Sequence, residues 1–255
     1  MSGPRLADRA AIVTGAGGGI GRAICVAFAA EGAKLVCAEI DVDSAQETAA
    51  AVEAAGGEAL VQACDVSRGD EARAAVEAAV ARYGGLHILV NNAAVFPTMA
   101  TICDLDEAEW ERALAVNIGG AYHMSRFAVP AIAAAGGGSI VHVASQMARV
   151  ANAGQTAYCT TKGALLMLAK GMALDHAHQN IRVNALSPGG IATEGMARKW
   201  GGMEAAEREW GEPKHPLGRL GRVEEVAQAA VFLASEESSF MTGADLVIDG
   251  GYTAW

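Results

Sequence analysis

Tyr158 and Lys162 are the pair whose types and spacing most clearly suggest chemistry. Residues four apart on a helix share a face, one turn from each other. A phenol has an ordinary pKa of about 10, and bringing it to about 7 requires roughly 4 kcal/mol. A lysine ammonium about 4–5 Å away supplies an interaction of that size at an effective dielectric constant of about 20. The pair could therefore exchange protons with a substrate, although the same spacing also occurs in plain helix-surface pairs.

A glycine-rich segment near the N-terminus suggests a phosphate-binding turn. Residues 14–21 read TGAGGGIG, between an apolar run and a helix-like stretch. Glycine lets the backbone approach a phosphate because it has no Cβ. The N-terminus of the following helix adds free N–H groups and a partial positive charge. The spacing is G-x-x-x-G-x-G rather than G-x-G-x-x-G, and its place between strand and helix favours a dinucleotide pyrophosphate.

Glu39 is the residue expected to distinguish the two nicotinamide dinucleotides. It ends the second apolar run, close to the offset of about 20 residues at which an acidic group binds the ribose hydroxyls of NAD. A carboxylate there repels the 2′-phosphate of NADP, and no basic residue within the glycine turn or just after Glu39 could pair with that phosphate. The sequence favours NAD; the alternative is a solvated charge at the end of a strand.

Short apolar runs alternate with longer helix-like stretches from end to end, which predicts a parallel sheet with helices on both faces. The expected strands are Ala10–Thr14, Lys34–Ala38, Glu58–Cys64, Leu86–Asn91, Ser139–Ala144, Ile181–Ser187 and Leu246–Ile248. The expected helices are Ile20–Glu31, Ser44–Ala55, Asp70–Tyr83, Asp106–Ala134, Thr156–His178 and Glu224–Ser235. Right-handed crossovers then give an α/β fold, a doubly wound (Rossmann-type) sheet of about seven strands. No linker divides the chain, so residues 1–255 are predicted to form a single dinucleotide-binding and catalytic domain.

The segment 190–216 departs from this alternation. Several glycines and prolines surround one short polar helix, expected at Met203–Trp210. Long connections inside a compact domain are usually functional, so we expect a substrate lid here. The alternative is a surface excursion without a role.

Composition excludes several classes of protein. The chain has 255 residues, 52% of them hydrophobic, with 19 Lys+Arg against 29 Asp+Glu and a net charge of −10. This excludes disorder and argues against nucleic-acid binding. No apolar run approaches the roughly 20 residues of a membrane span, and no signal peptide is evident at the start. The five cysteines form no C-x-x-C and the six histidines are scattered, which indicates a reduced, cytoplasmic protein with no metal site.

Further motifs occur in one order along the chain. They are NNAA at 91–94, Asn117 in AVNIGG, Ser145 in VHVAS, YCTTK at 158–162, PGGIAT at 188–193 and the closing GADLVIDGG. With the glycine turn, this set resembles the short-chain dehydrogenase/reductase family over essentially the whole chain. Each motif is weak alone, but the joint match is specific. Two positions depart from the family pattern, since Ala94 stands where glycine is usual and Thr161 where serine is usual.

The resemblance implies a catalytic set of Asn117, Ser145, Tyr158 and Lys162. Tyr158 would be the general acid/base, Ser145 would bind the substrate oxygen, and Lys162 would lower the pKa of Tyr158 and bind the nicotinamide ribose. Asn117 would kink its helix and hold a water that links Lys162 to solvent. Besides Tyr158 and Lys162, the cofactor would be held at its pyrophosphate, adenosine, middle and nicotinamide ends by Gly15, Gly18, Gly19, Ile20, Gly21, Glu39, Asp65, Val66, Asn91, Ala93, Pro188, Gly189, Ile191 and Thr193.

The implied reaction is reversible hydride transfer between a secondary alcohol and NAD, with alcohol oxidation as the favoured direction. The substrate pocket is expected from Gln146, Arg149, Asn152, Gln155, Arg198 and Trp200, near Phe96. The amides suggest a hydroxyl-rich substrate such as a sugar or polyol. The basic residues around the lid, which also include Lys199, Lys214 and His215, suggest an anionic substrate or are simply solvated charges.

Two other functions stay open. One is an NADPH-dependent 3-oxoacyl reductase of the same family, which Glu39 disfavours. The other is a non-catalytic dinucleotide sensor, which the intact catalytic set disfavours. Family members are commonly tetramers, so a homotetramer is expected, with helices 106–134 and 156–178 packing across one interface. The final residue, Trp255, is expected to be buried, either in its own chain or against a neighbouring subunit.

Overall fold

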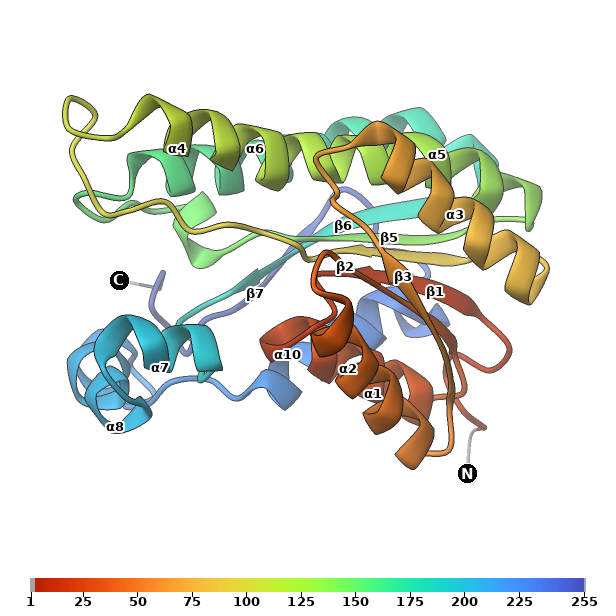
Figure 1. Cartoon of the computed structure of the whole chain (residues 1–255), viewed down its shortest axis with the longest axis horizontal. Coiled ribbons are helices and arrows are strands. Elements are labelled where there is room, and N and C mark those ends of the chain that lie inside the picture. The colour runs from red at the N-terminus through yellow and green to blue at the C-terminus, as the bar shows by residue number, and fades with distance from the viewer. Residues whose placement is uncertain (1–2, 255) are drawn as a thin grey trace.

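The computed structural model describes residues 3–254, built around a single seven-stranded sheet (Figure 1). The strand order is β3-β2-β1-β4-β5-β6-β7, and all neighbouring pairs are parallel. The doubly wound α/β fold predicted from the sequence is therefore confirmed. The strands are β1 (Ala10–Thr14), β2 (Lys34–Glu39), β3 (Glu58–Ala63), β4 (Ile88–Asn91), β5 (Gly138–Val143), β6 (Ile181–Pro188) and β7 (Asp245–Ile248).

Helices cover both faces of the sheet, and each face has its own apolar core. One layer consists of α1 (Gly19–Ala30), α2 (Val42–Ala54) and α10 (Val223–Ala234). The opposite layer consists of α3 (Gly69–Tyr83), α4 (Glu107–Ala113), α5 (Gly120–Ala134) and α6 (Thr156–His176). Within β1, Ala11 and Val13 belong to the core beneath α1 and α10, whereas Ile12 belongs to the core beneath α3, α5 and α6. Because each face of the sheet is covered by helices, both alternating sets of strand side chains are mostly apolar.

The expected helix 106–134 is not continuous. It consists of α4, one π-helical turn at Leu114–Gly119, and α5. The other expected helices and the strands lie within a few residues of their predicted bounds. The π-turn contains Asn117, so the backbone departs from α geometry at a residue that the family resemblance singled out.

The segment 190–216 contains more helix than the sequence predicts. It forms α7 (Glu194–Trp200), α8 (Met203–Ala206), a π-turn at Glu207–Gly211 and α9 (Glu212–Lys214), and α7 and α8 lie at one end of the sheet (Figure 1). The helix α7 was not expected because Gly195 suggests a loop. Its start is fixed by Thr193, whose Oγ1 accepts a hydrogen bond from the Met196 N–H at 3.1 Å, and its end by Gly201 at a φ of +76°.

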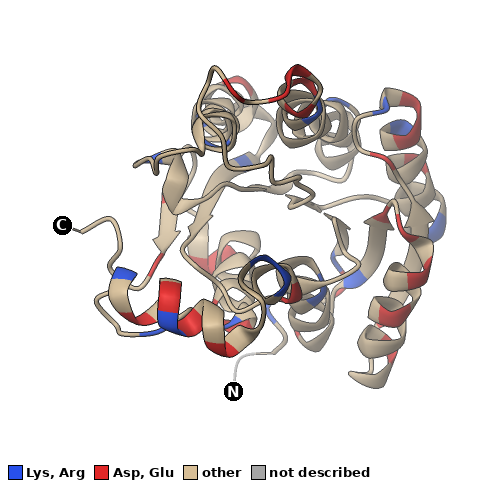
Figure 2. Ribbon diagram, turned by 60° about the vertical axis from the view of Figure 1, so that its left-hand side comes forward, with Lys and Arg blue, Asp and Glu red and all other residues tan. Residues whose placement is uncertain are grey.

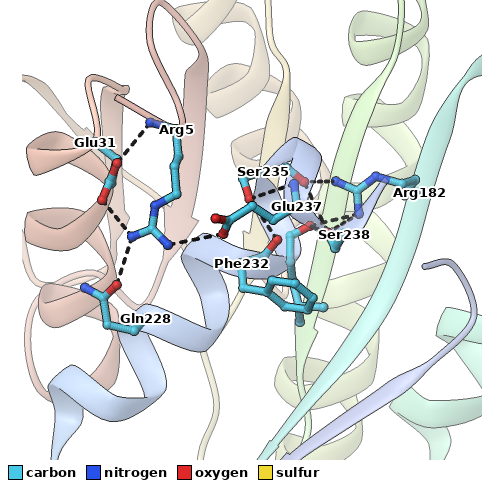
Figure 3. A network of polar contacts seen from close by, with 9 residues as sticks. Arg5, Glu31, Arg182, Gln228, Phe232, Ser235, Glu237 and Ser238 are labelled. Atoms are coloured by element: carbon cyan, nitrogen blue, oxygen red, sulfur yellow. Dashed lines mark hydrogen bonds and ion pairs between the residues drawn. The ribbon is translucent and has the colours of Figure 1, made fainter. Parts of the chain in front are cut away.

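Arg5 ties the N-terminal segment to the end of α1 and to α10 (Figure 3). Its Nη2 donates to Glu31 Oε1 at 2.6 Å, at the end of α1, and to Gln228 Oε1 at 3.0 Å, on α10. Its Nη1 donates to Glu237 Oε2 at 3.3 Å. The guanidinium lowers the pKa of the Glu31 carboxyl. This network joins the C-terminal end of α1 to α10, so it supports the helix whose other end forms the glycine turn.

The surface carries charges of both signs on its outer helices (Figure 2). Across residues 3–254, no helix has the length and apolarity needed to cross a bilayer. The same residues contain no cluster of three or more His, Cys, Asp or Glu side chains arranged to hold a metal ion. The five cysteines are unpaired; the Sγ atoms of Cys25 and Cys37 lie 3.9 Å apart in the core. Trp255, whose burial was predicted, lies outside the described residues.

Candidate active site

A cleft of about 1070 Å³ opens at the edge of the sheet where the parallel strands end. Loops that follow parallel strands meet at that edge, which is where such folds bind their ligands. Most of the residues predicted for the cofactor line this cleft: Gly15, Gly18, Gly19, Ile20, Gly21, Glu39, Asp65, Val66, Ala93, Tyr158, Lys162, Pro188, Gly189, Ile191 and Thr193. Their convergence makes the cleft the candidate cofactor site.

The glycine turn forms one wall of the cleft and requires its glycines. Gly15 has a φ of +63°, and a Cβ there would lie 2.8 Å from the Ala93 Cα. A Cβ on Gly21 would lie 2.0 Å from the Gly15 carbonyl oxygen, so α1 starts in close contact with the end of β1. Gly18 precedes α1 and offers no capping side chain, which leaves the first N–H groups of this helix available to an anion. The turn therefore fits a dinucleotide pyrophosphate.

Glu39 and Asp65 add two carboxylates to the lining of the cleft. Glu39 Oε2 accepts a hydrogen bond from the Gly17 N–H at 3.0 Å, and Oε1 accepts from the Ile40 N–H at 2.8 Å. Asp65 Oδ1 accepts from the Ser67 N–H at 2.9 Å and from the Ser67 hydroxyl at 2.7 Å. Both carboxylates are thus fixed by hydrogen bonds, and both residues line the cleft.

Asn91 lies behind the cleft rather than in its lining. It is buried, and its Nδ2 donates to Ser125 Oγ at 3.2 Å and lies 3.2 Å from His142 Nδ1. Its neighbour Asn92 lines the cleft, and its Nδ2 donates to the carbonyls of Thr14 at 2.9 Å and Gly15 at 3.1 Å. Asn92 therefore fixes the glycine turn, a role that we did not predict, although it stands in the same NNAA motif.

Ser145, Tyr158 and Lys162 meet at the floor of the cleft. Ser145 follows β5, and the other two lie on α6 one turn apart. Lys162 is only 3% exposed, its Nζ donates to the Val143 carbonyl at 2.7 Å, and burial lowers its pKa to about 8. Burial raises the pKa of Tyr158, and the Ser145 hydroxyl opposes this effect. This differs from the expectation that Lys162 acidifies Tyr158, because desolvation by burial is the largest effect on the pKa of the phenol, and the Lys162 Nζ lies 5.7 Å from the centre of its ring.

The side chain of Asn117 is held by the loop after β4 and by α6. Its Oδ1 accepts from the Val95 N–H at 2.8 Å, and its Nδ2 donates to the Val95 carbonyl at 3.0 Å and to Thr161 Oγ1 at 3.1 Å. Thr161 in turn donates to the Tyr158 carbonyl at 2.9 Å. The hydroxyl of Thr161, one of the two departures from the family pattern, therefore links the π-turn to the helix that carries Tyr158 and Lys162.

A smaller pocket of about 110 Å³ adjoins the cleft, and Ser145 and Tyr158 line both. Three of the predicted substrate residues, Gln146, Gln155 and Trp200, line this inner pocket. The rest of its wall is mostly apolar and includes Phe96, Met99, Leu105, Met147, Met196 and Trp210. The Phe96 ring stacks on Tyr158 with centroids 4.9 Å apart. The volume is well below the roughly 300 Å³ at which pockets for drug-sized ligands begin, so it suits a small molecule.

The other predicted substrate residues lie elsewhere. Arg149 lines neither cavity, and its Nε pairs with Asp245 Oδ2 at 2.6 Å. Asn152 also lies outside both linings, and its Oδ1 accepts from the Tyr252 hydroxyl at 3.1 Å. Arg198 lines only the large cleft. These three side chains therefore do not converge on the inner pocket.

The basic residues of the lid are dispersed. Lys199 lines both cavities, whereas Lys214 is exposed and lines neither. His215 is buried, and its Nε2 accepts a hydrogen bond from the Gly190 N–H at 3.1 Å. Trp210 lies between Trp200 and Tyr252, with ring centroids 6.2 Å and 6.1 Å away. Trp210 and Tyr252 were not among the predicted residues, because nothing in their spacing shows that the lid and the C-terminal segment meet.

Known proteins resemble the whole chain. The family model described as Enoyl-(Acyl carrier protein) reductase matches residues 15–253. Cyclohexanol dehydrogenase of Acinetobacter sp. (strain SE19) is 36% identical over 247 residues, covering 97% of this chain and 96% of the relative. Galactitol 2-dehydrogenase (L-tagatose-forming) of Cereibacter sphaeroides is 40% identical over 253 residues, covering 98% and 97%.

A solved structure agrees with these sequence matches. The crystal structure of a short-chain type dehydrogenase/reductase from Mycobacterium marinum superposes with a TM-score of 0.89 at 36% identity, covering 98% of this chain and 97% of that chain. The motifs, the sheet order, the glycine turn and the Ser-Tyr-Lys floor of the cleft agree with these matches. The chain belongs to the short-chain dehydrogenase/reductase family of oxidoreductases, whose members use nicotinamide dinucleotides.

Proposed function

We propose that the protein is an NAD-dependent dehydrogenase that reversibly oxidises a small secondary alcohol to a ketone. The observation that supports this most directly is the position of Ser145 and Tyr158, which line both the large cleft and the inner pocket. A substrate in the inner pocket and a dinucleotide in the cleft would meet at these two side chains. The hydroxyl of Ser145 is suited to bind an alcohol, and Tyr158, as its phenolate, is suited to deprotonate it.

The cleft has the features that a dinucleotide requires. The glycine turn and the start of α1 would hold the pyrophosphate, Glu39 the adenosine ribose, and Asp65 and Val66 the adenine. Pro188, Gly189, Ile191 and Thr193 would hold the nicotinamide end. When bound, the oxidised nicotinamide ring supplies the hydride acceptor and a positive charge that favours an anionic phenol.

The residues of this chain would handle the proton. The Ser145 hydroxyl would donate to the substrate oxygen and stabilise its developing negative charge, and the Tyr158 phenolate oxygen would take the hydroxyl proton and become a neutral phenol. Lys162, whose pKa burial lowers to about 8, can release and regain a proton near neutral pH, which suits it to pass the proton onward. Asn117 keeps this arrangement in place through Val95 and Thr161.

The inner pocket supports a small alcohol that carries further polar groups. Its volume of about 110 Å³ and its apolar wall suit a short or cyclic carbon skeleton, and Gln146 and Gln155 add hydrogen-bonding groups. The names of two relatives, cyclohexanol dehydrogenase and galactitol 2-dehydrogenase, refer to a ring alcohol and to a polyol. An anionic group on the substrate would have Lys199 as its partner at the edge of the pocket. Oxidation is the proposed direction because NAD is mostly oxidised in cells.

Replacement of the proposed base tests the reaction. Tyr158→Phe removes the group that takes the proton, so kcat for oxidation of secondary alcohols should fall by about 10²–10⁴-fold. Binding of NADH, measured by fluorescence titration, should stay within about twofold, because the glycine turn and Glu39 are unchanged. The measurement is NADH formation across a panel of sugars, polyols, sugar acids and simple secondary alcohols. Undiminished turnover in the variant would contradict the mechanism, and a wild type that binds NADH but turns over nothing would favour a sensor.

We also infer that the protein acts in the cytoplasm as a homotetramer. The helices that the family resemblance places at one subunit interface correspond to α4, α5 and α6. They carry exposed apolar side chains, among them Tyr122 on α5 and Met167 and Leu174 on α6, with Met167 64% and Leu174 82% exposed. Apolar side chains exposed on adjacent helices are typical of surfaces that become covered on association.

A further inference from the structure

Gln146 carries a buried polar atom that has no partner in the protein. The residue directly follows Ser145, opens a 3₁₀ turn over Gln146–Ala148, and is only 2% exposed. Within residues 3–254, its Oε1 accepts no hydrogen bond. Buried polar atoms in folded proteins almost always have a partner, and leaving one unsatisfied costs about 1–3 kcal/mol. An atom of this kind indicates that a ligand supplies the missing donor.

The position of the Gln146 residue indicates which ligand would meet it. Gln146 lines the inner pocket together with Ser145 and Tyr158, the two residues proposed to bind the reacting oxygen. Gly189 lies on the same wall and allows the Gln146 side chain to pack closely against its backbone. A Cβ at Gly189 would lie 2.8 Å from Gln146 Oε1. Met147 and Met196 on the same pocket wall have no donor in their side chains, and in the described structure the Trp210 indole N–H makes no hydrogen bond to Oε1.

The chemistry of the pocket restricts the donor to a neutral group. A carbonyl oxygen accepts but cannot donate, so the ligand must bring an O–H or N–H group. The inner pocket is lined by no carboxylate among the described residues, whereas Lys199 stands at its edge. A cationic amine would therefore enter an unfavourable environment, and a hydroxyl is the simplest donor.

We propose that Gln146 Oε1 accepts a hydrogen bond from a second hydroxyl of the substrate, on the carbon next to the one that is oxidised. This rests on the proposed alcohol oxidation. The adjacent carbon is proposed because Gln146 directly follows Ser145 in the chain and a pocket of about 110 Å³ leaves little room for a longer separation. Gln146 thus makes the enzyme selective for vicinal diols over alcohols with a single hydroxyl.

Matched substrates and a nearly isosteric variant test this selectivity. The pairs are 2-butanol against 2,3-butanediol and cyclohexanol against 1,2-cyclohexanediol. The wild type should oxidise the diol of at least one pair with a kcat/KM about 10- to 100-fold above that of its single alcohol. In Gln146→Met that ratio should fall to about one. Gln62→Met, on β3 and outside the inner pocket, is the matched control and should keep the wild-type ratio.

A binding measurement separates this inference from the proposed reaction. In the Tyr158→Phe background, calorimetry in the presence of NADH should show the diol binding more tightly than the single alcohol, and Gln146→Met should remove the difference. Gln146→Met should not lower the unfolding temperature, because an apolar side chain removes the unsatisfied atom. Gln146→Leu serves as a second variant.

Each remaining outcome is decisive. Equal kcat/KM within both wild-type pairs, or a ratio that survives both variants, would overturn the role of Gln146 while leaving alcohol oxidation intact. Weaker NADH binding in Gln146→Met with an unchanged diol ratio would assign Oε1 to the cofactor instead and would also overturn it. If no alcohol is oxidised with NAD, the proposed function fails, and the calorimetric difference still decides whether Gln146 recognises a second hydroxyl.

Discussion

A single carboxylate, that of Glu39, both closes the glycine turn and faces the cofactor cleft. One of its oxygens accepts from the Gly17 N–H, and the other from the N–H groups of Ile40 and Asp41, at 3.0, 2.8 and 3.3 Å. The side chain therefore has little freedom to move away from a ligand in the cleft. A negative charge fixed in this way would repel a 2′-phosphate wherever the adenosine ribose binds beside it.

Removal of that charge should change the choice of dinucleotide. Glu39→Gln keeps the size of the side chain and an oxygen acceptor for the turn, so the ratio of kcat/KM with NAD to that with NADP should fall by about tenfold, which corresponds to about 1.4 kcal/mol. Steady-state kinetics with both dinucleotides measure the ratio. Asp43→Asn removes an exposed carboxylate of α2 that does not line the cleft, and should leave the ratio unchanged. An equal change of the NAD-to-NADP ratio in both variants would mean that the effect comes from the overall charge of the protein and not from the position of Glu39.

The catalytic pair and the cofactor-binding turn could be predicted from the sequence, whereas the residues that form the substrate pocket could be predicted only in part. Tyr158, Lys162 and the glycine turn act through local spacing, which is visible in the sequence. Arg149 and Asn152 seemed available for substrate because their partners, Asp245 and Tyr252, lie far along the chain. Such long-range pairing leaves no local pattern.

At the scale of elements, β5 carries an internal histidine beside the catalytic floor. His142 is fully buried, and within residues 3–254 its Nε2 has no hydrogen-bond partner. It precedes Val143, whose carbonyl accepts from Lys162. Burial, together with the positive charge of Lys162, lowers the pKa of His142 to about 4. The folded protein therefore strongly prefers the neutral imidazole.

This preference should make stability depend on pH. The pKa of His142 falls from 6.5 to about 4 on folding, so the unfolded chain binds its proton more readily, and the free energy of unfolding should decrease as pH falls from about 6.5 to about 4. The contribution is about 3 kcal/mol over that window. His142→Gln should remove this part of the pH dependence, as urea unfolding at several pH values would measure. Parallel pH profiles for the two proteins would contradict the assignment.

Elements with regular periodicity could be predicted, and elements fixed by tertiary contacts could not. The central strands β1, β4, β5 and β6 are largely buried and were visible as short, mostly apolar runs. The π-turn at Leu114–Gly119 occurs where the side chain of Asn117 bonds the backbone of Val95, a contact between this helical turn and the loop after β4. The helix α7 depends on the cap at Thr193 and was hidden by Gly195.

For the whole molecule, the exposed apolar side chains of α5 and α6 lead to a prediction of its assembly. Light scattering should give a mass of four subunits of 26.0 kDa each. Leu174→Glu places a charge in the proposed interface, so the mass should fall to that of smaller species, because burying an unpaired charge is costly. Val80→Glu, on α3 and also exposed, is the control and should remain tetrameric. A wild type that is monomeric at micromolar concentration would contradict the proposal.

The aromatic contacts of the lid give the molecule an internal optical signal. Of the four tryptophans in the chain, Trp200 and Trp210 both line the inner pocket and lie within one aromatic cluster with Tyr252. Indole emission is sensitive to the polarity and packing of its surroundings. Half of the tryptophans are thus placed where a small molecule that enters the inner pocket displaces water from their rings. Ligand binding to this protein can therefore be followed by its intrinsic tryptophan fluorescence, without any label.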